Sequence, residues 1–200
     1  MPAAWLLVVY RTPTSPSTAR VAAWRGLHAL GGLFIAPTVS VLPPAVADAR
    51  QLDAVAMRVR SAGGSFELFE IEAFAEATEL TLRGRYSEAR DAEYAEVVEQ
   101  AAAMIAELER EGARDKFTYA EVEENEADLA KLQRWLRRVR ARDVFVSAGR
   151  AAAVAAVERA AARLEAFVGE AIAREQALVD ADAHITSAST PPLKIVRDRR

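Results

Sequence analysis

Three arginines surround one predicted helix start, and their chemistry suits the binding of an anion. Arg11 follows an apolar, strand-like run, and Arg20 and Arg25 lie in the helix predicted to start at Ser15-Pro16. A guanidinium presents planar N–H donors, and the first turn of a helix has backbone N–H groups without intrahelical partners. Both suit concentrated negative charge, so this segment is a candidate oxyanion or phosphate site. The alternative is that Arg20 is a structural anchor beside Trp24, while Arg11 and Arg25 are solvated.

A second group of arginines lies far along the chain, in the segment RWLRRVRAR at residues 134–142. A helix here would turn its apolar residues to one side and its arginines to the other. Exposed arginines are suited to contact DNA phosphates, although the segment has no base-reading pattern of its own. The alternative is that the arginines match the helix dipole, because the acidic run 121–128 opens the same predicted helix. The candidate phosphate contacts are Arg134, Arg137, Arg138 and Arg142.

The remaining reactive residue types argue against catalysis. The chain has no cysteine, which excludes disulfides, Cys-ligated zinc, iron–sulfur clusters and a thiol nucleophile. Its two histidines, His28 and His184, form no HxxxH pair, and neither accompanies a serine and an acid. No Walker-type or GxGxxG loop occurs, and the acidic run 121–128 lacks the spacing and glycine of a calcium loop. We therefore predict no catalytic residue, no metal site and no cofactor, and expect a protein that is not an enzyme.

The composition is that of a globular protein with one or two domains. The chain has 200 residues, 52% of them apolar and 28% charged, and a net charge of −3. The chain as a whole is therefore not a general nucleic-acid binder. The N-terminus lacks the basic region of a signal peptide, and no apolar stretch reaches the roughly 18 residues of a transmembrane helix. We expect a cytoplasmic protein with no membrane partner.

The first 84 residues have the element order strand–helix–strand–strand–helix–strand. Ser15 is the predicted N-cap of the first helix, and each helix ends at a glycine pair, Gly31-Gly32 and Gly63-Gly64. This order is the split βαβ pattern of four antiparallel strands with two helices on one face. We predict an α+β chain whose residues 1–84 form a ferredoxin-like domain. The predicted strands are 4–10, 33–36, 38–42 and 65–72.

The rest of the chain has helical patterns, and Gly84 is the predicted boundary before them. The first helix is expected at 85–111, the second starts at the capping box from Thr118 to Glu121, and the third spans 150–176. We predict that residues 85–176 form an all-α appendage of three helices and that residues 177–200 form a flexible tail. The third helix has a coiled-coil-like series of apolar residues: Val154, Val157, Ala161, Leu164, Val168 and Ala171.

Three segments carry a resemblance to a known family. They are WLLVVYRTPTSPSTARVAAWRGLHALGG with the later VSVLP, then DAEYAEV, then KFTYAEVEENEADLAKLQRWLRRVRARDVF. Over roughly residues 4–146 the chain resembles the N-terminal domain of the chromate-resistance protein ChrB family. The first segment is more loosely similar to the Cas2-like ferredoxin domain of PaaX-type transcription repressors. Cas2-like nucleases have a metal-binding Asp after the first strand, where this chain has Tyr10-Arg11, so the resemblance does not extend to nuclease chemistry.

The resemblance implies a regulator of a chromate-efflux operon, or an accessory protein in chromate resistance, that acts by binding rather than catalysis. The implied partners are promoter DNA, chromate or another oxyanion, and a second copy of the chain in a homodimer. Longer members of the family have a further C-terminal chromate-resistance domain, where this chain has an alanine-rich helix and a tail. The alternative is a dimeric interaction module that does not bind DNA and works with a separate chromate-resistance domain.

Overall fold

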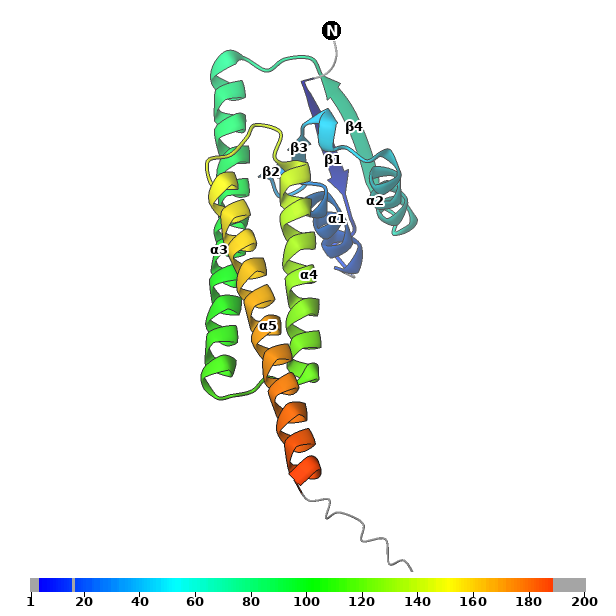
Figure 1. Ribbon diagram of the computed structural model, residues 1–200. Helices are drawn as coiled ribbons and strands as arrows, with labels where there is room; N and C mark the ends of the chain where they lie inside the picture. Colours follow the sequence, from blue (N-terminus) through cyan, green and yellow to red (C-terminus); the bar gives the residue numbers. More distant parts are fainter. Residues whose placement is uncertain (1–3, 16, 189–200) are drawn as a thin grey trace, which may run out of the picture.

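The chain folds into a small α+β head and a long bundle of three helices (Figure 1). The computed structural model describes residues 4–15 and 17–188. All neighbouring strands are antiparallel, in the order β2-β3-β1-β4, which confirms the predicted ferredoxin-like sheet. The head consists of β1 (Trp5–Arg11), α1 (Thr18–Ala29), β2 (Leu33–Ala36), β3 (Val39–Leu42), a 3-10 turn (Pro44–Val46), α2 (Ala49–Ser61) and β4 (Ser65–Ile71).

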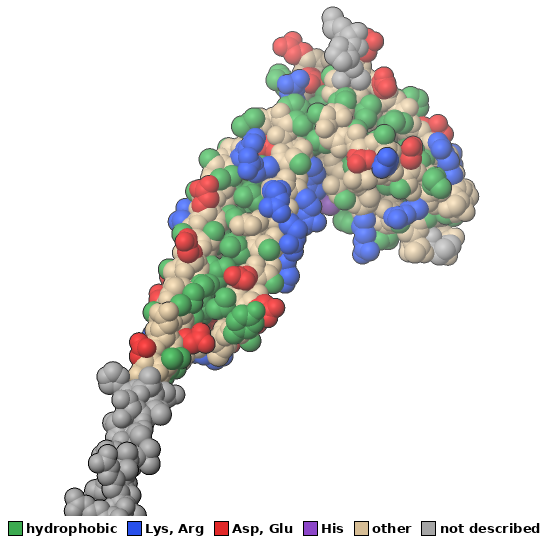
Figure 2. Space-filling model, turned by 45° about the vertical axis from the view of Figure 1, so that its right-hand side comes forward, with side chains coloured by type: hydrophobic (Ala, Val, Ile, Leu, Met, Phe, Trp, Pro, Cys, Tyr) green, Lys and Arg blue, Asp and Glu red, His purple; other side chains and the backbone are tan. Residues whose placement is uncertain are grey.

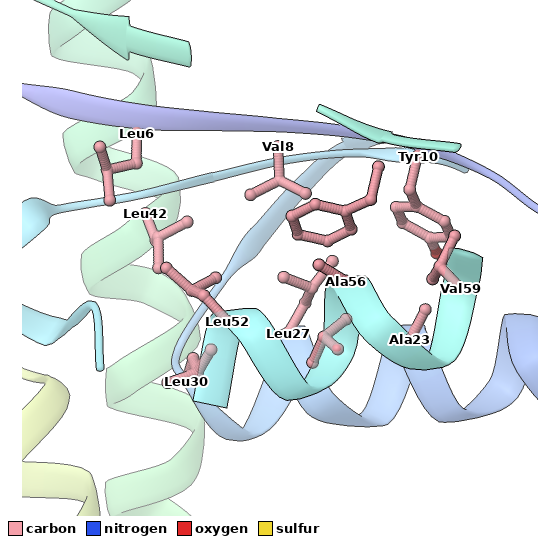
Figure 3. Packing of buried hydrophobic residues seen from close by; sticks show 12 residues of the cluster. Leu6, Val8, Tyr10, Ala23, Leu27, Leu30, Leu42, Leu52, Ala56 and Val59 are labelled. Atoms are coloured by element: carbon pink, nitrogen blue, oxygen red, sulfur yellow. The ribbon is translucent and has the colours of Figure 1, made fainter. Parts of the chain in front are cut away.

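One face of the sheet packs against α1 and α2. Alternate residues of a strand point to opposite faces, so Leu6, Val8 and Tyr10 of β1 all turn toward the two helices (Figure 3). They meet a continuous apolar layer in which Leu27 of α1 and Val59 of α2 are fully buried. This layer is the core of the head, and it explains the helical spacing of apolar residues in both helices.

The two glycine pairs end their helices as predicted. Gly31 and Gly63 have φ values of 86° and 80°, the left-handed conformation that favours glycine. The next amide in each pair reaches back over the last turn: Gly32 N donates to Leu27 O at 2.8 Å, and Gly64 N donates to Val59 O at 3.0 Å. The predicted start of α1 is wrong, because its N-cap is Ser17 rather than Ser15, and no side chain caps it.

The second half contains the three predicted helices, with different ends. They are α3 (Glu76–Ala113), α4 (Tyr119–Arg142) and α5 (Arg150–Ala188). Helix α3 begins well before Arg85 and runs through Gly84, so the predicted boundary lies inside a helix. A glycine costs a helix about 1 kcal/mol relative to alanine, which the packing of Leu82 and Tyr86 on the sheet outweighs. Helix α5 continues past Gln176 to Ala188; the remainder of the predicted tail, 189–200, lies outside the described residues.

The buried side of α5 differs slightly from the predicted apolar series. Of the six predicted residues, Val157 and Leu164 are buried, and the other four are half-buried: Val154, Ala161, Val168 and Ala171. The helix lies against both α3 and α4, and small alanine side chains allow this close approach. The residues of α5 that are buried are Ala153, Ala156, Val157, Ala160, Leu164 and Phe167.

The second face of the sheet is covered by α3 and by the loop between α4 and α5. Trp5 is fully buried there, with its ring centroid 6.1 Å from that of Tyr86 and 5.8 Å from that of Phe145. The indole Nε1 of Trp5 donates a hydrogen bond to Glu79 at 2.8 Å. An aromatic pair of this kind contributes about 0.5–1.5 kcal/mol beyond its buried area. This aromatic contact joins the head to the bundle.

We predict that Glu111→Gln stabilises the protein at neutral pH. Burial, the largest influence, raises the pKa of Glu111 above its usual 4.5, and the nearby Glu121 and Glu107 raise it further, against a hydrogen bond from Asn125. Because the pKa of Glu111 is higher in the folded than in the unfolded protein, the contribution of this carboxyl to stability is fully present below the unfolded pKa. That contribution is lost as the pH rises through the folded pKa. The amide avoids this decline. Urea unfolding should show a gain at pH 7 that disappears near pH 4.

The exposed Glu123→Gln on α4 is the control for this change, and it should leave the free energy of unfolding unchanged at both pH values. A loss of stability at pH 7 in Glu111→Gln would show that the ionised carboxylate is favourable in the folded protein.

Candidate functional site

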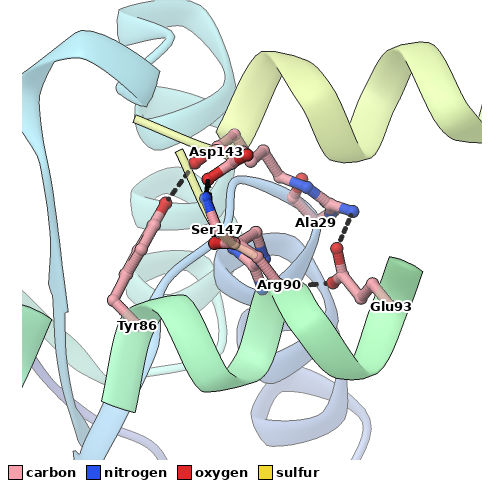
Figure 4. Close-up of polar contacts among 7 residues, drawn as sticks. Ala29, Tyr86, Arg90, Glu93, Asp143 and Ser147 are labelled. Atoms are coloured by element: carbon pink, nitrogen blue, oxygen red, sulfur yellow. Dashed lines mark hydrogen bonds and ion pairs between the residues drawn. The ribbon is translucent and has the colours of Figure 1, made fainter. Parts of the chain in front are cut away.

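Four polar residues form a cluster where the head meets the bundle, and we call them the junction cluster: Tyr86, Arg90, Glu93 and Arg142. Figure 4 labels the first three, which all lie on α3. Glu93 accepts from both arginines, from Arg142 Nη2 at 2.8 Å and from Arg90 Nη2 at 3.1 Å. Arg142 Nη1 also donates to the carbonyl of Ala29 at 3.1 Å, and the Tyr86 hydroxyl donates to the carbonyl of Arg142 at 3.0 Å. The cluster therefore ties together α3, the end of α4 and the end of α1.

The junction cluster has more positive than negative charge. Two guanidinium groups share the single carboxylate of Glu93. Burial is the largest influence on the pKa of Arg142 and lowers it; Glu93 opposes this lowering and Arg90 adds to it. Arg90 is only 2% exposed, and its Nε and Nη1 have no hydrogen-bond partner among the described residues. Its guanidinium carbon lies 5.0 Å from the centre of the Tyr86 ring, a cation–π contact that partly stabilises the charge.

A pocket of about 200 Å³ leads from the surface to Arg90. Its wall includes Trp24 and His28 of α1, which stack with ring centroids 5.3 Å apart, and Tyr86 and Arg90 of α3. Trp24 is 48% exposed whereas Arg90 is almost fully buried, so the tryptophan lies at the opening and the guanidinium lies deeper. The pocket thus combines mainly uncharged walls with one buried cation.

The three predicted anion-binding arginines all lie at the surface of the head. The side chains of Arg11, Arg20 and Arg25 are all exposed. Arg25 lies five positions after Arg20 on α1, which places the two about 140° apart around the helix. Arg20 lies close enough to Tyr10 for its charge to lower the pKa of that hydroxyl, against the larger effect of burial. The role of these arginines in anion binding stays a prediction.

Sequence reasoning did not single out Arg90, although its position in α3 indicates a buried charge. Arg90 lies four residues after Tyr86 and four before Tyr94, in the buried stripe of α3. A charged residue in an apolar stripe is unusual, because burying it requires a partner. That pattern identifies a buried charge, and only the tertiary structure shows the pocket beside it.

Three of the four predicted DNA-contacting arginines are available to solvent. Arg134, Arg137 and Arg138 of α4 are exposed. Figure 2 shows Lys and Arg side chains gathered along the side of the bundle that faces the head.

Arg142 differs from the prediction: its side chain is only 16% exposed and is bound by Glu93 and by the carbonyl of Ala29. It is the last residue of α4, where the chain turns back against α3, so it serves the junction rather than the surface.

Within residues 4–15 and 17–188, no three His, Cys, Asp or Glu side chains lie close enough together to hold a metal ion. In the same part of the chain, no helix combines the length and the apolar character that a bilayer crossing needs.

The fold and the junction cluster define an α+β protein with a ferredoxin-like head and a helical bundle. The family model described as "Protein ChrB, N-terminal" matches residues 20–178. A curated relative, Protein ChrB of Cupriavidus metallidurans, is 34% identical over 93 residues, which are 46% of this chain and 28% of that protein. No solved structure gave a significant match. The chain belongs to the ChrB N-terminal family, which confirms the resemblance noted in its sequence. The 93 residues matched to the Cupriavidus metallidurans protein cover 28% of its length, which is well under two thirds.

We predict that Glu93→Gln destabilises the protein by about 3 kcal/mol, because it leaves the buried Arg90 and the half-buried Arg142 without a carboxylate. Urea unfolding at pH 7 measures the change. Glu107→Gln removes the carboxylate of an exposed pair with Arg110 on the same helix and should cost less than about 1 kcal/mol. Equal effects of the two substitutions would contradict a special role for Glu93.

Proposed function

We propose that this protein is a regulatory or accessory component of chromate resistance that binds promoter DNA in the cytoplasm and responds to an oxyanion. In this proposal it acts by binding rather than by catalysis. Membership of the ChrB N-terminal family supports the link to chromate resistance. The observation that carries the DNA-binding part is the exposed group of arginines on α4.

The charge of α4 supports a contact with DNA phosphates. Residues 129–142 contain six Lys and Arg residues and no Asp or Glu, in a chain whose net charge is −3. Arg134 and Arg138 are four residues apart, so they lie on one side of the helix with Arg137 beside them. Cations spaced in this way can neutralise successive phosphates and release their counterions, which favours binding at low salt.

Charge reversal tests this surface. Arg137→Glu combined with Arg138→Glu should weaken binding to the DNA upstream of the gene, as measured by fluorescence anisotropy. It should also flatten the salt dependence, because each lost phosphate contact removes about 0.9 from the slope of log K against log salt. Arg50→Glu with Arg58→Glu makes the same charge change on the exposed side of α2 and should have a much smaller effect.

Two outcomes would contradict the DNA-binding proposal. One is equal loss of affinity in the two double variants, which would indicate a dependence on net charge alone. The other is the lack of any binding by the unmodified protein at low salt, which would favour the dimeric interaction module.

That second candidate, a dimeric module, is favoured by one feature of α5. The helix extends beyond the ends of α3 and α4 (Figure 1), and its distal part carries exposed apolar side chains. Ile172 and Val179 are 52% and 63% exposed, and their spacing of seven residues places them on one side of the helix. A second copy of the chain would bury this strip.

We predict that Ile172→Glu with Val179→Glu shifts a dimer toward the monomer, because each charge would have to be buried at the contact. Light scattering after size-exclusion chromatography over a range of concentrations measures the mass. Met57→Glu with Leu80→Glu alters two exposed apolar residues outside α5 and should leave the mass unchanged. A dimer that persists in the α5 variant would place the contact elsewhere.

A further inference from the structure

We propose that the pocket between α1 and α3 binds a small tetrahedral oxyanion, such as sulfate or chromate, through the guanidinium of Arg90. This site would supply the oxyanion response of the proposed function, and in that respect it rests on that function. The binding itself is independent of DNA. It uses none of the three exposed arginines around the start of α1.

The first argument is charge. Arg90 is a buried cation whose nearest carboxylate, Glu93, is shared with Arg142. Each oxygen of Glu93 already accepts from one of the two guanidinium groups. The Nε and Nη1 donors of Arg90 are left without a hydrogen-bond partner within the described part of the chain. A buried cation with unpaired N–H groups favours an anion that can accept from them.

The second argument is the composition of the pocket. Its wall has no acidic residue; besides Arg90 it has the imidazole of His28 and uncharged residues such as Trp24, Phe34 and Ala89. The Tyr86 hydroxyl already donates to a carbonyl. An anion in the pocket would therefore meet a guanidinium without repulsion from a carboxylate in the wall. The oxygens of a tetrahedral oxyanion can each accept from a separate N–H group, which suits the planar donors of an arginine.

The third argument is access. The volume of about 200 Å³ is several times the roughly 30 Å³ that one water molecule occupies in the liquid, so it has room for one oxyanion. Gly31 lines the pocket beside Arg90. A Cβ atom at Gly31 would lie 3.1 Å from Arg90 Nη1 and 2.9 Å from the Tyr86 hydroxyl. The glycine, which the left-handed turn also requires, adds no side chain at the point where Arg90, Tyr86 and Arg142 meet.

Isothermal titration calorimetry with sodium sulfate and with sodium chromate at low ionic strength tests the site. Sodium chloride serves as the control salt. The unmodified protein should bind each oxyanion at one site per chain. Arg90→Met keeps an unbranched, apolar side chain and removes the charge and the N–H donors, so it should weaken binding by at least about tenfold. Arg58→Met, at an exposed position on α2, should bind like the unmodified protein.

Ala89→Leu provides a second variant that leaves Arg90 in place. Ala89 is half-buried in the pocket wall, and a leucine there would occupy space that the anion needs. Circular dichroism shows whether Arg90→Met folds. If it does not fold, Ala89→Leu is the variant that tests the site. We expect it to lose oxyanion binding while keeping its helical signal.

Three results would each overturn the proposed site. The first is that neither oxyanion gives a heat of binding, and the second is that Ala89→Leu and folded Arg90→Met bind as the unmodified protein does. The third is that Arg25→Met loses binding while the two pocket variants keep it. DNA binding is measured separately in the absence of oxyanion. Failure of the anion test with DNA binding retained would reject the pocket alone, whereas failure of DNA binding with anion binding retained would reject the DNA-binding function alone.

Discussion

The contact of Trp5 with Tyr86 and Phe145 is the interaction on which the arrangement of the two parts depends. A four-stranded sheet has two faces, and α1 and α2 cover only one of them. The other face carries Trp5 and Val41, which would be costly to leave in water. Helix α3 covers it with its first turns and then continues beyond the sheet. The bundle is therefore built on a helix that begins as part of the core of the head.

This arrangement explains why charged residues are buried at the junction. Once the start of α3 lies on the sheet, its next turns meet the end of α1 and the end of α4. Carbonyl groups at helix ends lack intrahelical partners, and Arg142 satisfies one of them at Ala29. Glu93 then balances Arg142, while Arg90 remains only partly compensated. Arg142 is also the last residue of the helix that carries the exposed arginines, so the junction cluster and that surface are connected through one residue.

The head was largely predictable because local signals agreed with the tertiary structure. Short β-rich runs, helical apolar spacing and two glycine pairs all indicated the same order of elements, and the glycines adopt the conformation that they were expected to adopt. Prediction failed where packing outweighed propensity. Gly84 suggested a boundary, yet the burial of Leu82 and Tyr86 on the sheet holds α3 together through that glycine. The N-cap of α1 was also predicted wrongly, because it is Ser17 and not Ser15.

The sequence by itself determined the ferredoxin-like order of elements, the helical second half and the exposure of Arg134, Arg137 and Arg138, because each follows from local periodicity. Only the tertiary structure decided whether Arg142 and Arg90 are buried and which groups they contact. Periodicity shows which residues share a side of a helix, but not which element that side will meet. Arg142 was expected at the surface and is paired in the junction, while Arg90 lies beside a pocket built from α1 and α3. Burial and pairing of a charge depend on residues distant in the chain, so only the fold defines that site.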